Sequence, residues 1–205
     1  MNAAAPSPPL APSERADLIT KDMVRWLERA VIGLNLCPFA KGVHAKGQIH
    51  YVVSAATGAE ALAQDLRREL ADLAAAPAEV RDTTLLMAPD CLQDFLEFND
   101  FLGLAEDVLE ELDLDGTLQI ASFHPQFQFA GTGAGDVTNC TNRAPYPTLH
   151  LLREDSIDRA VQAYPEAEAI YERNMEVLEQ LGMPGWQALD VGVNTAASTP
   201  DLPKD

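Results

Sequence analysis

Residues 49–88, IHYVVSAATGAEALAQDLRRELADLAAAPAEVRDTTLLMA, decide the fold class of this chain. Side chains alternate through residues 49–54 in a β-branched setting, which is typical of a strand. Residues 59–75 predict a helix, because four leucines recur along one stripe. The short apolar run at residues 83–88 predicts a second strand, which Pro89 ends. Two strands joined by a helix favour a right-handed crossover and a partly parallel sheet.

Further elements are predicted on both sides of this unit. Ser13 is a plausible N-cap of a first helix, which should end at Cys37 because Pro38 disfavours an α conformation in the residue before it. The elements expected after residue 89 are, in order, a helix (91–112), a strand (117–123), an irregular stretch (124 to about 147), a strand (148–153) and two helices (157–164 and 165–181). Gly182 and Pro184 should stop the last helix.

These elements predict an α/β fold, a single-domain sandwich with a mixed sheet of about four strands packed by helices. The last two strands have no helix between them, so we expect them to pair antiparallel. The length of 205 residues suits one domain, which we place at residues 13–193. Residues 1–12, an Ala/Pro-rich tail, and residues 194–205 have little to bury and are expected to be disordered.

The charge balance excludes several classes of partner. The chain has 14 basic and 32 acidic residues, with a net charge of −18. This charge opposes nucleic-acid phosphates and anionic membranes. No apolar run approaches the roughly 20 residues of a membrane helix, and no export signal is evident. Three cysteines without metal spacing fit a reducing cytoplasm. We therefore expect a cytoplasmic protein that binds neither nucleic acid nor membrane, and leave its oligomeric state open.

The acidic residues are concentrated in one segment. Residues 89–116 contain 10 acidic side chains and no Lys or Arg. Such a segment is typical of a solvated helix face. The alternative is a docking face for a basic partner.

The stretch at residues 122–150, SFHPQFQFAGTGAGDVTNCTNRAPYPTLH, is the expected place of a ligand site. A loop this long in a compact domain is usually functional or disordered, and its three phenylalanines and three prolines argue against disorder. We expect an ordered polar loop over strand ends, where α/β sheets place ligands. Its spaced glycines do not join a clear strand to a helix start, so no cofactor is predicted.

Two histidines of this stretch are candidate catalytic residues. His124 follows one predicted strand and His150 lies within the next, so both imidazoles could face one pocket as general acid and base. The alternative is a pair of histidines satisfied by local carbonyls. A metal site with Asp136 as a third ligand is a further alternative, although no HxxxH or CxxC spacing supports it.

Four residues of the same stretch are candidate substrate-binding residues. Arg143 is nearly the only cation there and suits a carboxylate or phosphate. Asn139, Asn142 and Tyr146 supply neutral hydrogen-bonding groups. The alternative for Arg143 is an internal acidic partner, Asp136 or Glu154.

Cys37 is the third candidate catalytic residue. At the end of the first helix its thiolate would be opposed by the helix dipole. If Pro38 instead opens a new turn, Cys37 would be its N-cap and somewhat activated. Lys41 and Lys46 lie close by in sequence and favour the anion. The alternative is a small buried hydrophobic residue, the usual role of cysteine.

Several segments resemble a bacterial family of uncharacterised proteins, the family with the domain-of-unknown-function label 1415. The resemblance spans roughly Trp26 to Trp186 and lies in LNLCPFAKG (34–42), TTLL with Pro89 (83–89), QIASFHPQFQF (119–129) and TNRAPYPTLHLLRE (141–154). It implies a bacterial protein of one domain and carries over no reaction.

The residues favour an enzyme of hydrolase or acyl-transfer type that acts on a small anionic or amide-bearing metabolite. Cys37 would be its nucleophile, and we expect His124, Asp136, Arg143 and His150 to converge around one cavity. The alternatives are a non-catalytic ligand- or partner-binding module and a metal-dependent hydrolase.

Overall fold

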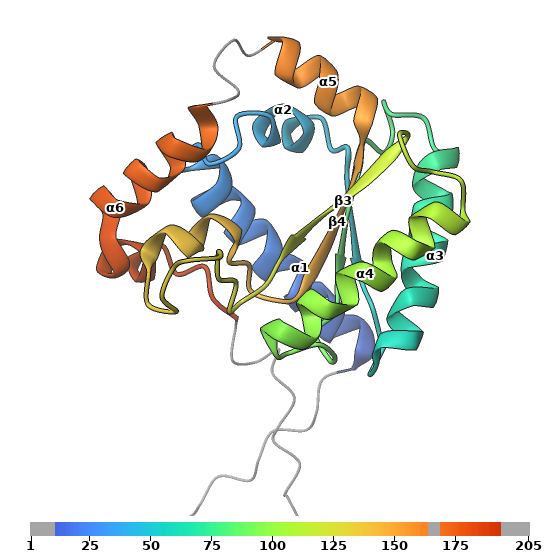
Figure 1. Ribbon diagram of the computed structural model, residues 1–205, viewed down its shortest axis with the longest axis horizontal. Helices are drawn as coiled ribbons and strands as arrows, with labels where there is room; N and C mark the ends of the chain where they lie inside the picture. Colours follow the sequence, from blue (N-terminus) through green and yellow to red (C-terminus); the bar gives the residue numbers. More distant parts are fainter. Residues whose placement is uncertain (1–10, 164–168, 194–205) are drawn as a thin grey trace, which may run out of the picture.

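Four strands form one mixed sheet in the order β1-β2-β4-β3 in a computed structural model, which describes residues 11–163 and 169–193 (Figure 1). The strands are β1 (Ile49–Val53), β2 (Thr83–Met87), β3 (Leu118–Phe123) and β4 (Thr148–Arg153). The β1 and β2 strands are parallel, whereas β4 runs antiparallel to both of its neighbours, β2 and β3. The predicted α/β fold with a mixed four-stranded sheet packed by helices is confirmed, as is the antiparallel pairing of the last two strands.

The described helices account for most of the remaining chain. They are α1 (Pro12–Trp26), the π-helix η1 (Leu27–Ile32), α2 (Ala40–Ala45), α3 (Ala59–Ala75), α4 (Phe95–Glu111), the 3₁₀-helix η2 (Val137–Asn142), α5 (Glu154–Ala163) and α6 (Ile170–Ala188). Among the residues that the structure describes, no helix combines the length and the apolar character needed to cross a membrane.

One face of the sheet is covered by α3 and α4 (Figure 1). The leucine stripe predicted for α3 is fully buried there, at positions Leu62, Leu66, Leu70 and Leu73. These leucines share one core with Leu86 of β2 and with Leu149 and Leu151 of β4. Burial of each such side chain contributes about 1.5–3 kcal/mol relative to an exposed one. This layer is the larger hydrophobic core of the domain.

The opposite face of the sheet packs against α1 and η1. Ile19, Met23 and Trp26 of α1 are buried on Leu85 and Met87 of β2. In contrast, α6 packs mainly on η2 and the segment before α2, through a small cluster of Leu36, Cys140 and Leu178. The α1 face is therefore less completely covered along the sheet than the α3–α4 face, and this difference leaves room for a cavity.

The first helix ends earlier than predicted. The α-helix gives way to η1 at Leu27, and Asn35 then adopts a left-handed conformation with φ 54°. Pro38 opens a new turn that leads into α2, a short helix the sequence did not predict. Cys37 therefore precedes a helical turn rather than ending the first helix, which is the second of the two alternatives considered for it.

Other element boundaries also differ from the predictions. The α4 helix begins at Phe95 rather than at Cys91, because Leu92 has φ 54° and Asp94 supplies the N-cap. Helical structure resumes beyond Gly182, where φ is 64°, and continues to Ala188. The predicted start of the last helix at Pro165 and the predicted disordered tails, apart from residues 11 and 12, lie outside the described residues.

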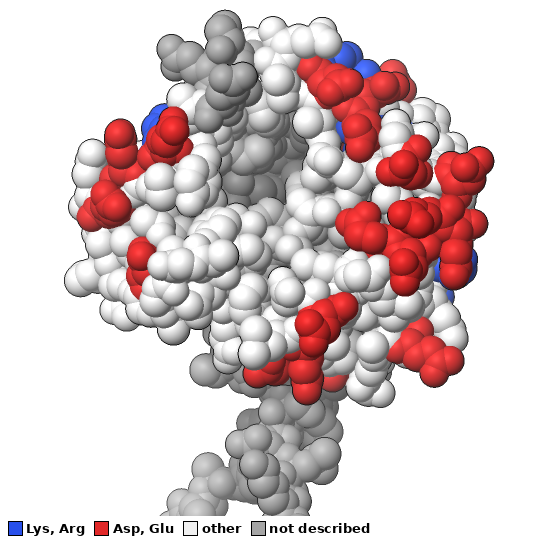
Figure 2. Space-filling model, in the orientation of Figure 1, with Lys and Arg blue, Asp and Glu red and all other residues white. Residues whose placement is uncertain are grey.

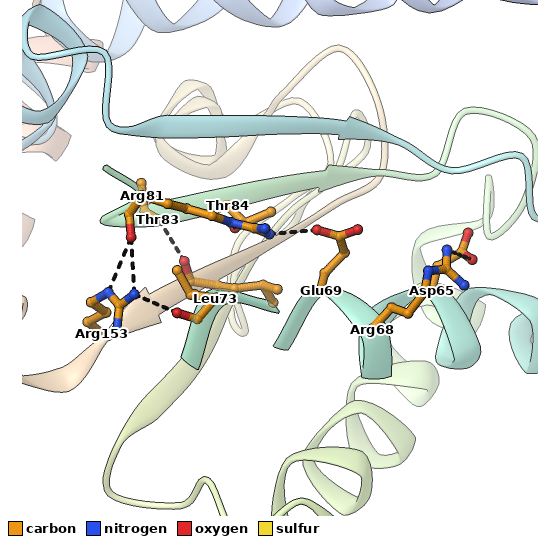
Figure 3. Close-up of polar contacts among 9 residues, drawn as sticks. Asp65, Arg68, Glu69, Leu73, Arg81, Thr83, Thr84 and Arg153 are labelled. Carbon is orange, nitrogen blue, oxygen red and sulfur yellow. Dashed lines mark hydrogen bonds and ion pairs between the residues drawn. The ribbon is translucent and has the colours of Figure 1, made fainter. Parts of the chain in front are cut away.

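A set of polar contacts fastens the end of α3 to the sheet (Figure 3). Arg153 of β4 donates hydrogen bonds to the carbonyl oxygens of Leu73, Ala76 and Arg81. Arg81 in turn forms a 2.6 Å ion pair with Glu69 of α3, and the two side chains are only 12% and 10% exposed. These contacts hold the start of β2 against the end of α3.

Candidate functional site

The α1 face of the sheet contains a cavity of about 520 Å³. Its walls are formed by the end of α1 with η1, by the segment leading into α2, by α5 and by all four strands. Its lining is mostly apolar, and its polar members are Cys37, Lys46, Asp82, Thr83, Gln119, His150 and Ser156. The volume falls within the range of about 300–1,000 Å³ that is typical of small-molecule sites. Figure 2 shows this side of the molecule hollowed, with mostly uncharged side chains around the hollow.

His150 faces the cavity from β4. It pairs with Ala121 of β3 in the sheet, and its ring lies 5.8 Å from that of Phe123, another lining residue. Within the described part of the chain, neither ring nitrogen of His150 makes a hydrogen bond to the protein. Burial lowers the pKa of His150 to about 4. The cavity therefore contains a neutral imidazole with unused hydrogen-bonding capacity at neutral pH.

Cys37 lines the same cavity from the helical side. Its pKa is raised because burial disfavours the thiolate, and the nearby backbone N–H groups of Phe39 and Ala40 partly offset this effect. These N–H groups become available because Pro38 opens the turn into α2. At neutral pH the side chain is therefore a thiol in the cavity that also contains His150.

His124 is separated from this cavity by the sheet. Its ring lies 5.5 Å from Phe95 and 5.1 Å from Phe98, both on α4, and the residue is fully buried. Nε2 lies 3.1 Å from the carbonyl oxygen of Leu92, and Nδ1 accepts a hydrogen bond from the backbone N–H of Gln126. Both ring nitrogens are therefore used within the protein. The expected convergence of His124 and His150 does not occur, because consecutive residues at the end of β3 point to opposite faces.

Arg143 is used within its own loop rather than by an acidic partner. Its Nε donates to the carbonyl oxygen of Phe127 at 3.0 Å, and its Nη2 donates to that of Ala134 at 2.7 Å. The side chain lines a second cavity of about 490 Å³ together with Asp94 and Gln126. Arg143 therefore stabilises the loop and does not reach the cavity that contains His150.

The other three residues predicted to bind substrate are also bonded within the protein. Asn139 is fully buried, and its side-chain oxygen accepts hydrogen bonds from Phe129 N–H and Thr132 Oγ1 at 2.9 Å each. Asn142 donates to the carbonyl oxygen of Ser122 at 3.3 Å. The Tyr146 hydroxyl donates to buried Asp22 at 2.8 Å. Their hydrogen bonds organise the stretch at residues 122–150.

The three ligands considered for a metal are likewise separated. Asp136 caps η2 by accepting hydrogen bonds from Thr138 N–H at 2.9 Å and Thr138 Oγ1 at 2.7 Å. These contacts lower the pKa of its carboxyl group. No group of three or more His, Cys, Asp or Glu with metal-binding geometry occurs among residues 11–163 and 169–193. The structure therefore gives no support for a metal-dependent hydrolase built on His124, His150 and Asp136.

Sequence reasoning missed several polar residues of the cavity. Gln119 of β3 and Ser156 of α5 line it, but neither belongs to a recognisable motif. The period of two along β3 carried a usable signal, because it places Gln119 and Phe123 on one face and away from His124. The register between β3 and β4, which adds His150 to that face, depends on tertiary pairing.

The comparison with known families agrees with the resemblance seen in the sequence. The profile of the family described as "Protein of unknown function (DUF1415)" matches residues 18–188, most of the chain. No curated protein and no solved structure matches the chain. The matched residues include η1, the turn that holds Cys37, all four strands and most of the cavity lining. The chain therefore belongs to the DUF1415 family of proteins of unknown function.

Proposed function

We propose that this protein is an enzyme that takes a small, largely apolar substrate into the α1-face cavity and hydrolyses or transfers an acyl group there. The observation that carries the proposal is that Cys37 and His150 line one apolar cavity of about 520 Å³. A thiol and an imidazole are the residue types that acyl-transfer chemistry uses as nucleophile and base. The proposal moves the substrate from the loop at residues 122–150 to this cavity, because the loop's polar groups are already bonded within the protein.

With these protonation states, the thiol has to be activated by a general base during the reaction. Cys37 is a thiol at neutral pH because burial raises its pKa, and His150 is a neutral imidazole because burial lowers its pKa to about 4. In the described part of the chain no hydrogen bond joins the two side chains, so the substrate complex has to bring the Cys37 sulfur within reach of the neutral imidazole, which then accepts the thiol proton. The nucleophile is therefore a thiol in the resting protein and loses its proton only during the reaction.

The reaction follows from these roles. The Cys37 sulfur forms a bond to the acyl carbonyl carbon while His150 accepts the thiol proton. The bond from that carbon to the leaving group then breaks, and the leaving group takes the proton from His150. Water or an acceptor alcohol attacks the resulting thioester with His150 as base, and the proton returns to the Cys37 sulfur. The chain's own groups supply every proton transfer.

The direct test is hydrolysis of p-nitrophenyl esters whose acyl chains increase in length from acetyl to octanoyl. We expect kcat/KM to rise with chain length, because longer chains bury more apolar surface in the cavity. Cys37→Ala and His150→Gln should each lower kcat/KM by about 100-fold or more. Hydrolysis that persists at the wild-type rate in Cys37→Ala would overturn the proposal.

Two substitutions outside the cavity provide matched controls. Cys91 is a buried free cysteine that does not line the cavity, and His44 pairs with Glu28 at 3.2 Å. Cys91→Ala and His44→Gln should therefore leave ester hydrolysis unchanged. Loss of activity in these variants as well would indicate a general effect on folding.

A non-catalytic ligand-binding module is the second candidate function. The raised pKa of Cys37 favours it, because a protonated thiol packed in an apolar wall can simply be part of the lining. In that case an apolar ligand would bind without turnover, and Cys37→Ala would retain binding. The ester series combined with calorimetric binding separates the two candidates.

The proposed chemistry requires a reduced thiol. Cys37, Cys91 and Cys140 are all free cysteines in the structure. This supports a reducing compartment, and we propose the cytoplasm as the place of action. We further propose that the net charge of −18 keeps the protein from binding nucleic acid.

A further inference from the structure

We infer that the substrate of the α1-face cavity is an amphiphilic anion, with an apolar body inside the cavity and an anionic group at Lys46. The inference rests on the proposed function, since it assumes that this cavity is the substrate site. It adds the charge of the substrate's polar end, which neither the family nor the acyl chemistry specifies.

Lys46 supplies the positive charge. It follows α2 directly as its C-cap residue, and among the described residues that line the cavity it is the only Lys or Arg. The side chain is exposed and makes no ion pair with a residue in the described part of the chain. Its ammonium group is therefore available to a ligand that extends from the cavity towards solvent.

One carboxylate, Asp82, lies among the described residues of the lining. It stands just before β2, and its Oδ1 accepts a 2.6 Å hydrogen bond from Ser156 Oγ of α5. This bond ties α5 to the start of β2 and leaves the negative charge of Asp82 in place. Of the two charged side chains in the described lining, Asp82 is half-buried and bonded to Ser156, whereas Lys46 is exposed.

The cavity also contains a hydrogen-bond donor that a ligand can use. His150 retains a ring N–H without a protein partner in the described part of the chain, whereas the N–H of Ala40 is already bonded to the Cys37 carbonyl oxygen. An unused donor in a cavity favours a ligand with acceptor oxygens, and a carboxylate or phosphate is the strongest such acceptor.

The charged residues around the cavity are unevenly distributed, and the positive ones lie near α2. The segment between η1 and α3, residues 33–58, contains Lys41 and Lys46 and no acidic residue. Many acidic side chains lie over α3 and α4, on the other side of the sheet, and others lie over α6 (Figure 2). On α5, Asp155 and Asp158 are exposed but do not line the cavity. The lysines of residues 33–58 therefore give the α2 side of the cavity a local positive charge.

The test compares three ligands that share one apolar body: octanoate, octanol and octyltrimethylammonium. Binding to the full chain is measured by calorimetry at low and high salt. We expect octanoate to bind about two- to fivefold more tightly than octanol, as an exposed charge pair predicts, and the ammonium ligand to bind most weakly. Higher salt should reduce the preference for octanoate.

Variants of two lysines on the same segment make the test specific. Lys46→Gln should bring the octanoate-to-octanol affinity ratio close to one, and Lys46→Arg should keep it. Lys41→Gln is the matched control, since Lys41 is exposed on α2 but does not line the cavity, and it should keep the wild-type ratio.

The outcomes separate this inference from the proposed function. If octanol and octanoate bind equally, or if the ammonium ligand binds best, the anionic preference is overturned while the cavity remains the ligand site. If none of the three ligands binds, the proposed function fails as well. If the preference survives in Lys46→Gln, Lys46 is not its source and the inference is overturned.

Discussion

Cys37 and His150 line one cavity from different parts of the chain, Cys37 from the segment before α2 and His150 from β4. Burial favours the uncharged form of both side chains. It raises the pKa of the thiol and lowers that of the imidazole. Both groups are therefore uncharged at neutral pH. A base that stays neutral well below its ordinary pKa has a measurable consequence for activity.

Ester hydrolysis should vary little with pH on the acid side of neutrality. With a pKa of about 4, His150 remains almost fully neutral at pH 5.5, so kcat/KM should fall less than about twofold between pH 7.5 and pH 5.5. An imidazole with the ordinary pKa of 6.5 would cause a fall of about tenfold over the same interval. Initial rates corrected for the Cys37→Ala background distinguish the two profiles.

His150 should also make the fold sensitive to acid. Above pH 6.5 the side chain is neutral in both the folded and the unfolded protein, so it does not affect stability. Between pH 6.5 and about 4 the unfolded chain binds a proton that the folded protein does not. The free energy of unfolding should therefore decrease as the pH is lowered from 6.5 to 4, by up to about 3 kcal/mol from this group.

Urea unfolding of the wild type and of His150→Gln at a series of pH values tests this linkage. The variant lacks the titrating group, so its stability should fall less steeply between pH 6.5 and pH 4. Parallel slopes for the two proteins would contradict the buried, neutral state of His150. The comparison uses the slope with pH rather than the absolute stability, which the substitution itself can change.

Gly33 is predicted to be required at the end of η1. A Cβ added at this position would lie 2.2 Å from the carbonyl oxygen of Arg29, so the backbone must shift to accept any side chain. Since Leu27 and Val31 of η1 line the cavity, Gly33→Ala should lower both stability and ester hydrolysis. We expect a loss of about 1–3 kcal/mol in urea unfolding, as for other overpacked sites.

Gly103 of α4 provides the control for this substitution. A Cβ there meets nothing within 4 Å, and alanine favours a helix by up to about 1 kcal/mol over glycine. Gly103→Ala should therefore keep or increase the stability and leave hydrolysis unchanged. Equal effects of the two substitutions would show that the close approach at Gly33 does not shape the cavity.

The ion pair between Glu69 and Arg81 should contribute far more to stability than the neighbouring exposed pair (Figure 3). Arg81→Met leaves the nearly buried Glu69 carboxylate without its cation and should cost about 3–5 kcal/mol. Arg68 pairs with Asp65 at 2.6 Å, but its side chain is 64% exposed, so Arg68→Met should cost less than about 1 kcal/mol.

The double variant Glu69→Leu with Arg81→Met tests the reason for this difference. If the cost of Arg81→Met comes from the unpaired carboxylate, removal of that carboxylate should restore much of the lost stability in urea unfolding. A double variant no more stable than Arg81→Met would indicate that packing, rather than charge, is lost.

Local patterns were sufficient to predict the four strands and the main helices, but not the order of the strands in the sheet. The leucine stripe of α3 is buried as expected, and the apolar side chains of β1 pack partly buried against the two cores. The α2 helix was not predicted, because its six residues carry no amphipathic stripe long enough to recognise. The start of α4 was predicted four residues too early, at Cys91 instead of Phe95, since the left-handed conformation of Leu92 has no local sequence signal.

The candidate site was only partly predictable for a physical reason. The polar residues of the stretch at residues 122–150 suggested a ligand, yet a long ordered loop also needs such residues to satisfy its own backbone. Asn139 and Arg143 serve that purpose through hydrogen bonds to Phe129, Phe127 and Ala134. The cavity itself depends on the pairing of β3 with β4 and on the placement of α2, which are tertiary properties.

The most direct test of the central claim is the mass of the intact protein after brief reaction with p-nitrophenyl octanoate and acid quench. We predict one octanoyl adduct per chain in the wild type, located on Cys37 by peptide mapping and absent from Cys37→Ala. His150→Gln should form it much more slowly, while Cys91→Ala should form it at the wild-type rate. An adduct on another residue, or ester turnover without any adduct on Cys37, would contradict the assignment of Cys37 and His150 as nucleophile and base.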